Sequence, residues 1–350
     1  MKAAPLKEPY EFTIQEKEIP EPGPEEVLIE VSTCGICGTD LEAYMGNEPS
    51  SWNIEYPFQM GHELSGTVKE VGTNVPDLAE LEEGDAVVPD GRVVCNVCHY
   101  CREGQYNLCE NQSYIAAGFS QYAVYPYENL ISVPEGVSMD EAAFTEPLSC
   151  CINGNDKLND VPLGGLGVVI GAGPIGLLHM QLLQNRGLGT VIVDLNSRRL
   201  QAAEELGADH TVEVESQGEV NQDVVDLVND VSHGRGADVV VSAAGHDPSV
   251  LQEAIDISSK RGQIVYFAAT MSDPVTLNLD PIHYEELTIV GSHDSTFGKY
   301  ETALEVIERG VVDVDPIISH RFPLEEIDEA FEVAKKKKDL KVMVDNPEAQ

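Results

Sequence analysis

VVIGAGPIGLLHMQLL, residues 168–183, is the stretch of sequence that decides the fold. Its first three residues are β-branched and predict a buried strand, and its apolar end predicts a helix. Between them, Gly171, Ala172, Gly173, Pro174, Ile175 and Gly176 have the spacing G-x-G-x-x-G. In that spacing the glycines allow a tight turn, the close approach of a pyrophosphate and close packing of helix on strand. The stretch therefore predicts a dinucleotide-binding unit.

An acidic residue follows the glycine turn at the distance that this kind of unit requires. The next predicted strand, VIVD, ends in Asp194. A carboxylate at this point accepts hydrogen bonds from the adenosine ribose hydroxyls and repels a 2′-phosphate, so we expect NAD as the cofactor. Arg198 and Arg199 follow closely. Because they could neutralise a further phosphate, NADP remains the alternative, and Arg199 is included among the expected cofactor-binding residues.

The rest of the chain divides into regions that differ in their pattern of predicted strands and helices. Short apolar strands at 237–245 and 262–269 alternate with helical segments, a pattern that predicts parallel βαβ units. The first 150 or so residues are instead rich in Gly, Pro and short β-branched runs, which predict an irregular, mostly β domain. From about His293 onward, two amphipathic helices and the strand LKVMV are expected.

Four cysteines form a compact cluster in the first region. The spacing is C-x2-C-x2-C-x7-C, given by Cys95, Cys98, Cys101 and Cys109. The first three are too close in sequence to pair as unstrained disulfides, whereas four thiolates on one loop can surround Zn²⁺ tetrahedrally. Such a closed site leaves no position for a substrate. The loop 95–109 is therefore predicted to hold a structural zinc ion.

Composition excludes several classes of partner. Asp and Glu number 61 against 21 Lys and Arg, so the formal net charge is −40. This surface would repel nucleic acids and anionic membranes. We find no apolar signal core and no apolar run of 18 residues, so a cytoplasmic protein outside the membrane is expected. The acidic excess also suggests a halophilic host, with an ordinary acidic protein as the alternative.

Two further motifs carry residues of the metal-ligand type. CGICGTD spans residues 34–40 and GHE spans residues 61–63. Cys37 and His62 offer sulfur and imidazole ligands that suit Zn²⁺. Taken alone, Cys34 and Cys37 are equally consistent with a redox pair or with half of a structural zinc site, and a single histidine is usually structural.

Five motifs together give the sequence a family resemblance. CGICGTD, GHELSG, the four-cysteine loop, EPLS (146–149) and the glycine turn stand in the order seen in medium-chain zinc dehydrogenases. The sequence most resembles the polyol (sorbitol-type) and threonine dehydrogenase branch, and ISHRFPLEEIDEAFE extends the similarity to nearly the whole chain. The resemblance implies an α/β fold. A doubly wound Rossmann domain (153–292) would be joined by a β-rich, GroES-like catalytic domain (1–152 and 293–350).

The resemblance also implies a catalytic zinc site. Cys37 and His62 match the family's ligands, Glu63 matches an adjacent acid that ligates in some members, and Glu146 matches a glutamate that holds the metal-bound water or approaches the metal. Cys34 would then be a bystander. Zinc would lower the pKa of the substrate hydroxyl.

Three further residues have expected roles around this zinc site. Thr39 matches the relay residue that takes the substrate proton, and Asp40 would orient His62. Glu42 stands where many relatives have a relay histidine, so it either passes the proton onward or is a surface carboxylate.

We therefore predict a zinc-dependent oxidoreductase that transfers a hydride from a secondary hydroxyl of a polyol or related sugar alcohol to NAD(P)⁺. A threonine-type or aldose dehydrogenase is the alternative within the family, because His293 and Asp294 occupy a segment where sorbitol dehydrogenases usually carry an arginine. A catalytically inactive cofactor-binding protein is the alternative from another class. Relatives are commonly dimers or tetramers, so a homo-oligomer is expected, with YEELTIVGS as a candidate edge strand.

Overall fold

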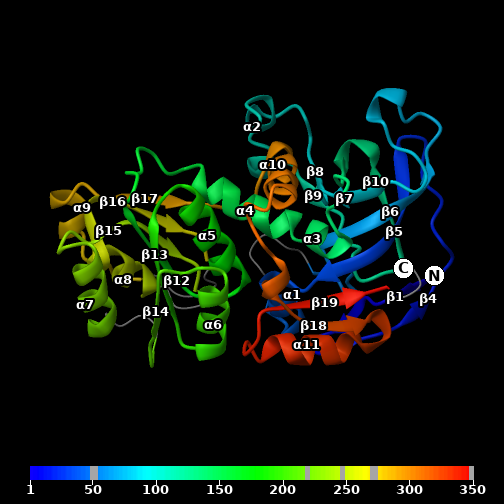
Figure 1. Cartoon of the computed structure of the whole chain (residues 1–350). Coiled ribbons are helices and arrows are strands. Elements are labelled where there is room, and N and C mark those ends of the chain that lie inside the picture. The colour runs from blue at the N-terminus through cyan, green and yellow to red at the C-terminus, as the bar shows by residue number, and fades with distance from the viewer. Residues whose placement is uncertain (48–53, 217–220, 245–248, 269–274, 347–350) are drawn as a thin grey trace. The chain divides into compact units, whose positions relative to one another are not determined.

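The chain folds into two compact units. The computed structural model describes residues 1–47, 54–216, 221–244, 249–268 and 275–346. The first unit contains 1–149, 295–310 and 318–350, and the second contains 150–294 and 311–317. Both the blue and the red end of the chain therefore belong to the first unit (Figure 1). These divisions lie a few residues from the predicted domain limits, which stay a prediction.

The second unit contains the predicted parallel sheet. Its six strands have the order β14-β13-β12-β15-β16-β17, and every pairing is parallel. The strands are β12 (Leu166–Ile170), β13 (Gly189–Asp194), β14 (His210–Glu213), β15 (Ala237–Ser242), β16 (Ser258–Tyr266) and β17 (Thr288–Gly291). The chain moves outward from β12 first to one side and then to the other, which is the order of a doubly wound sheet.

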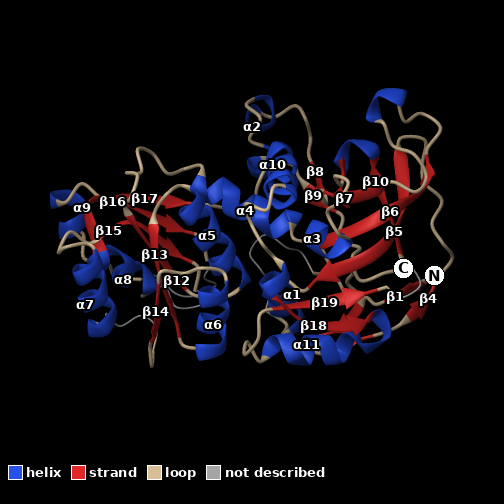
Figure 2. Ribbon diagram, viewed as in Figure 1, coloured by secondary structure: helices blue, strands red, loops and turns tan. Residues whose placement is uncertain are grey.

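Helices alternate with these strands along the chain and lie beside the sheet (Figure 2). They are α5 (Pro174–Asn185), α6 (Ser197–Glu205), α7 (Gln222–Val231), α8 (Val250–Ile257) and α9 (Asp280–Tyr284), with a 3-10 turn at Asp315–Ile317. The core between them is aliphatic and includes Val168, Val191 and Val240. Strands buried on both faces explain why the sequence shows continuous apolar runs rather than alternation.

The first unit is built on a mostly antiparallel sheet. Five strands follow one another in the order β11-β7-β6-β5-β19, β18 pairs in parallel with β19, and β10 pairs with β5. The strands are β5 (Glu26–Gly35), β6 (Glu63–Val71), β7 (Ala86–Pro89), β10 (Tyr122–Pro126), β11 (Leu130–Ser132), β18 (Ile318–Pro323) and β19 (Lys341–Asp345). Since β19 pairs with β5, the two ends of the chain contribute to one sheet.

Short elements complete the first unit. The small strands are β1 (Lys2–Ala3), β2 (Leu6–Glu8), β3 (Glu11–Phe12), β4 (Gln15–Glu16), β8 (Arg92–Val93) and β9 (Ser113–Tyr114). The helices are α1 (Gly38–Tyr44), α2 (His99–Arg102), α3 (Met139–Ala143), α10 (Phe297–Glu308) and α11 (Ile327–Lys335), and the 3-10 turns are Asp77–Ala79, Tyr106–Leu108, Tyr127–Asn129 and Leu324–Glu326. Helix α4 (Thr145–Asn155) contains the division between the units.

The structure confirms the predicted α/β fold class, with a parallel sheet in one unit and a β-rich second unit. Among the described residues, no helix is both long and apolar enough to cross a lipid bilayer.

The glycine turn is required by close backbone contacts. Gly171 has φ +107°, in the left-handed region that favours glycine. A Cβ atom on Gly176 would lie 1.7 Å from the carbonyl oxygen of Gly171. Helix α5 can therefore begin this close to β12 only if residue 176 has no side chain.

We expect Gly176→Ala to lower the free energy of unfolding by about 2 kcal/mol or more, because the added methyl group must displace backbone atoms. Gly298→Ala is the matched control. Gly298 lies inside α10 and a Cβ there would meet nothing within 4 Å, so alanine should be neutral or stabilise by up to about 1 kcal/mol. Urea unfolding measures both, and equal stability of the two variants would contradict the packing argument.

Candidate catalytic metal centre and cofactor turn

The predicted cofactor-binding residues come together at the end of β12. Gly173 precedes the first residue of α5, so the free N–H groups of that helix face the turn and can bind phosphate. Asp194, at the end of β13, is nearly buried and accepts hydrogen bonds from the backbone N–H groups of Ala172 at 2.7 Å and Asn196 at 2.9 Å. The carboxylate thus also ties the second strand to the glycine turn.

Arg199 lies beside the same turn. Its Nη1 atom is 4.0 Å from Oδ2 of Asp194 and 3.7 Å from the position that a Cβ of Gly173 would take. The guanidinium group is therefore near both the acid and the predicted pyrophosphate position. The structure places the glycines, Pro174, Ile175, Asp194 and Arg199 around one turn, and their use in cofactor binding stays a prediction.

Strand pairing assembles the predicted catalytic metal site in the first unit. Cys37 precedes α1, directly after β5, and Glu63 is the first residue of β6. The ladder between the two strands pairs Gly35 with Glu63, so the ends of β5 and β6 that carry Cys37, His62 and Glu63 lie side by side. Their ligand atoms all lie within 4.8 Å of one another. A sulfur, an imidazole and a carboxylate at this spacing fit a zinc ion.

Asp40 contacts two of these three residues, Cys37 and His62. It is fully buried on α1, and its Oδ2 accepts the N–H of Cys37 at 3.0 Å. Its Oδ1 is 3.5 Å from Nδ1 of His62. Burial alone would lower the pKa of His62, but Asp40 and Cys37 outweigh burial and raise that pKa well above its usual value. Asp40 therefore faces one imidazole nitrogen and leaves Nε2 for a metal.

Lys341 is the residue of this site that sequence reasoning missed. It begins β19, and its Nζ lies 2.5 Å from Oε2 of Glu63 and 3.3 Å from the carbonyl oxygen of Ile36. Both members of the ion pair are buried. Burial would lower the pKa of Lys341, but Glu63 and Cys37 raise it above its usual value. The only signal in the sequence is a lysine directly before the apolar residues of this strand, Val342, Met343 and Val344.

Gly35 leaves space for this ion pair. A Cβ atom at Gly35 would lie less than 2.5 Å from Oε2 of Glu63, so a side chain there would displace the carboxylate. The glycine thus belongs to the metal site, although the sequence pattern gave it no role.

The remaining predicted catalytic residues lie around this centre. The Thr39 hydroxyl is 3.8 Å from Sγ of Cys37. Glu42 is buried on α1 and accepts a hydrogen bond from Nδ2 of Asn47 at 2.7 Å. Glu146, in the first turn of α4, is not among the three residues whose ligand atoms lie within 4.8 Å of one another. Its charge nevertheless contributes to raising the pKa of Lys341, which places it in the electrostatic neighbourhood of the site.

The four-cysteine loop has the geometry of a closed metal site. The four sulfur atoms lie within 4.8 Å of one another, and all eight cysteines of the chain are free thiols. Backbone N–H groups point at the sulfurs, from Cys98 to Cys95 Sγ at 3.4 Å and from Cys101 to Cys98 Sγ at 3.5 Å. Hydrogen bonds from the backbone of Cys101 and Glu110 lower the pKa of Cys98 to about 6. Such donors stabilise thiolates, which fits Zn²⁺.

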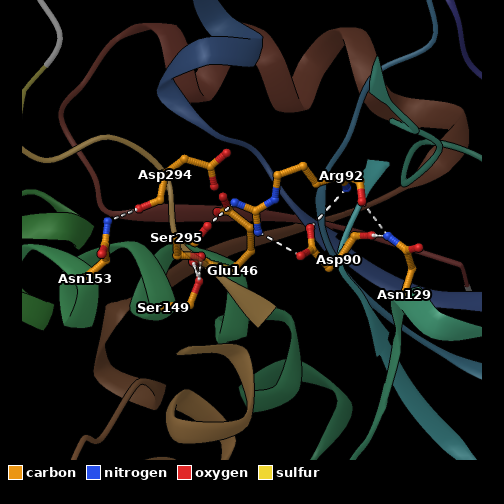
Figure 3. A network of polar contacts seen from close by, with 8 residues as sticks. All are labelled: Asp90, Arg92, Asn129, Glu146, Ser149, Asn153, Asp294 and Ser295. Carbon is orange, nitrogen blue, oxygen red and sulfur yellow. Dashed lines mark hydrogen bonds and ion pairs between the residues drawn. The ribbon is translucent and has the colours of Figure 1, made fainter. Parts of the chain in front are cut away.

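Figure 3 shows a second set of polar residues, of which the sequence indicated only Glu146 and Asp294. In the first unit, Arg92 and Asp90 form a buried ion pair with an Nη2–Oδ2 distance of 2.7 Å. Ser149 and Ser295 are in hydrogen-bond contact at 2.7 Å, one turn from Glu146. In the second unit, Asn153 donates to the carbonyl oxygen of Asp294 at 2.8 Å.

Comparison with known proteins gives consistent matches over the chain. The model of the alcohol dehydrogenase GroES-like domain matches residues 23–135, and that of the zinc-binding dehydrogenase matches residues 174–309. The chain is 33% identical over 341 residues to a sorbitol dehydrogenase of Halalkalibacterium halodurans, covering 95% of each protein. It is 32% identical to an L-threonine 3-dehydrogenase of Bacillus subtilis, covering 91% of each.

Two solved structures with bound cofactor share the fold. A zinc-binding dehydrogenase of Sinorhizobium meliloti bound to NADP has a TM-score of 0.86 and 28% identity, covering 98% of both chains. An alcohol dehydrogenase of E. coli CFT073 complexed with NADH also has a TM-score of 0.86 and 28% identity, covering 99% of both chains.

We expect Lys341→Met to destabilise the metal-free protein by about 3–5 kcal/mol, because it leaves the buried carboxylate of Glu63 without its counter-charge. Lys7→Met is the matched control. Lys7 and Glu11 have the same 2.5 Å N–O distance, but both are about half exposed, so solvent screens the pair and that change should cost far less than Lys341→Met.

Urea unfolding in the presence of a chelator measures both changes. The double variant Lys341→Met with Glu63→Gln should recover much of the loss, since it removes the orphaned charge. If Lys341→Met and Lys7→Met cost the same, the buried pair does not carry the stability assigned to it.

Proposed function

We propose, from the premise that this chain belongs to the zinc-binding alcohol dehydrogenase family, that it oxidises a secondary hydroxyl of a polyol or related sugar alcohol and passes the hydride to NAD. The observation that carries the proposal is the grouping of Cys37, His62 and Glu63 within 4.8 Å at the ends of β5 and β6. The glycine turn of the second unit supports it, because that turn supplies a phosphate-binding helix N-terminus.

Cys37 and His62 would hold the catalytic zinc ion. When bound, zinc acts as a Lewis acid on the substrate hydroxyl, and the nicotinamide accepts the hydride. Asp40, with Oδ1 3.5 Å from Nδ1 of His62, would orient the imidazole so that its other nitrogen could bind the ion. Glu63 is held by Lys341 at 2.5 Å, so we propose that it serves chiefly as a counter-charge beside the site.

Thr39 would take the proton of the substrate hydroxyl. Its own hydroxyl lies 3.8 Å from the sulfur of Cys37 and is partly exposed, so a substrate held at the ion would be within its reach. Glu42 lies three residues further along α1, on the same face of the helix. We propose Glu42 as the next proton acceptor. Glu146, which stands apart from the three grouped residues, would accept hydrogen bonds from bound hydroxyl groups rather than ligate directly.

NAD is the proposed cofactor. Both oxygens of Asp194 are fixed by backbone N–H groups, so the negative charge stays where a 2′-phosphate would have to bind. Arg199, at 4.0 Å, offsets part of that charge and keeps NADP as the alternative. The related structures support either cofactor, since one is bound to NADP and the other to NADH.

The comparisons name two substrate classes and do not distinguish between them. The relatives include a sorbitol dehydrogenase and an L-threonine 3-dehydrogenase at nearly equal identity. A threonine-type or aldose dehydrogenase is therefore the second candidate. The complete group of Cys37, Thr39, His62 and Glu63 argues against an inactive cofactor-binding protein.

We also propose a cytoplasmic homo-oligomer. β17 is the last strand of its sheet in the described part of the chain and pairs there only with β16. An edge strand of this kind offers unpaired backbone groups to a second copy. Dimers and tetramers are the proposed states.

The decisive assay offers polyols, aldoses and threonine to the purified chain with NAD or NADP. We expect the highest kcat/KM for a polyol with NAD, and two zinc ions per chain, one at the group that contains Cys37 and one at the four-cysteine loop. Cys37→Ser should abolish turnover and retain the ion of the four-cysteine loop. A higher kcat/KM for threonine or for an aldose would replace the polyol as the proposed substrate class. Zinc and NAD binding without any turnover would indicate an inactive protein.

Salt adaptation is the further proposal that follows from the net charge of −40. At molar salt the Debye length is only ~3 Å, so repulsion between surface carboxylates is screened. We expect the thermal midpoint to rise when KCl is increased from 0.1 to 3 M, as scanning calorimetry would measure. Sucrose at equal osmolality is the control, because it lowers water activity without screening charge. A midpoint that responds equally to both would contradict charge screening.

A further inference from the structure

A buried chain of polar contacts begins at Arg92 in β8 (Figure 3). The guanidinium group donates to Oδ2 of Asp90 at 2.7 Å and to the carbonyl oxygen of Ser295. Asn129 donates to the carbonyl oxygens of Asp90 at 2.7 Å and Arg92 at 2.6 Å, which fixes the loop that carries both. Arg92 is only 2% exposed, so its contacts with Asp90 and Ser295 are shielded from solvent.

The chain continues through two serines to the first turn of α4. The hydroxyl of Ser149 donates to the carbonyl oxygen of Glu146 at 2.7 Å. A hydroxyl has one proton, so in its 2.7 Å contact with Ser295 the Ser149 oxygen must be the acceptor. Ser295 therefore donates to Ser149 through its side chain and accepts from Arg92 through its carbonyl group. Both serines are fully buried.

Electrostatics place the side chain of Glu146 in the same region. Tyr300, on α10, is fully buried, and burial is the main cause of its raised pKa. Asp90 and Glu146 raise that pKa further, whereas Arg92 opposes them. The pKa of this one phenol group is thus affected by both carboxylates and by the guanidinium group. Figure 3 shows the carboxylate of Glu146 on the side of the guanidinium group of Arg92.

We propose that Arg92 is a positioning residue for Glu146, acting through Ser295 and Ser149. The planar guanidinium holds Ser295 by one nitrogen and Asp90 by another, a geometry that lysine cannot reproduce. Ser295 then fixes Ser149, and Ser149 fixes the carbonyl group of Glu146. These contacts fix the backbone of the first turn of α4. They thereby fix the Cα position from which the Glu146 side chain extends. The inference rests on the proposed function, in which Glu146 works beside the catalytic metal.

The test is a double-mutant cycle. Ser149→Ala and Arg92→Lys are each made in the wild-type chain and in a Glu146→Gln background. In the wild type, each change should lower kcat/KM about tenfold, the equivalent of one lost buried hydrogen bond. If both act through Glu146, neither should lower kcat/KM further once Glu146 is replaced. Equal losses in both backgrounds would overturn the proposal.

Zinc retention gives a readout that does not depend on turnover. During dialysis against a chelator, Ser149→Ala should change the rate of zinc loss from the Cys37 site, with no change in the Glu146→Gln background. The ion of the four-cysteine loop is the internal reference and should leave at the same rate in all variants. Accelerated loss of both ions would indicate general loosening and overturn the proposal.

Ser258→Ala is the matched control. Its hydroxyl donates to the carbonyl oxygen of Ala254 at 2.7 Å, as that of Ser149 does to Glu146, but it lies in the second unit and outside the proposed machinery. It should leave kcat/KM and both zinc ions unchanged; a loss equal to that of Ser149→Ala would overturn the proposal. Absence of turnover in the wild type would instead refute the proposed function, and the zinc readout would still decide the role of Ser149.

Discussion

The predicted metal site depends on the buried ion pair between Lys341 and Glu63. A carboxylate placed without compensation beside Cys37 would be costly to desolvate and would add to a negative charge that is already large. The ammonium group 2.5 Å away supplies that compensation before any metal binds. The ligand group can therefore be assembled by strand pairing, because its charges are already balanced locally.

The same arrangement occurs a second time in the first unit. Arg92 is buried with Asp90, as Lys341 is buried with Glu63. Each buried cation is matched with its own carboxylate, although acids outnumber bases almost three to one in the chain as a whole, 61 to 21. Each of these two buried pairs is therefore close to neutral, whereas the carboxylates at the surface are the ones whose charge solvent and salt can screen.

The parts of the site that lie in one continuous stretch could be predicted from the sequence. The glycine turn and the four-cysteine loop are of this kind, because their geometry is set by local spacing. Cys37 and His62 needed the family resemblance, since two separate motifs do not reveal which strands pair. Lys341 and Glu63 are 278 residues apart, and Arg92 is a single arginine at the start of the two-residue strand β8. Their roles arise from sheet topology and burial, which spacing does not encode.

The position of β19 has a consequence for synthesis of the protein. The strand occupies residues 341–345 of 350 and pairs with β5, which is formed by residues 26–35. On a translating ribosome, the early strands with Cys37, His62 and Glu63 emerge long before their buried lysine partner. The second unit can mature during translation, but the metal site must wait, with the carboxylate of Glu63 unneutralised, until β19 has been synthesised.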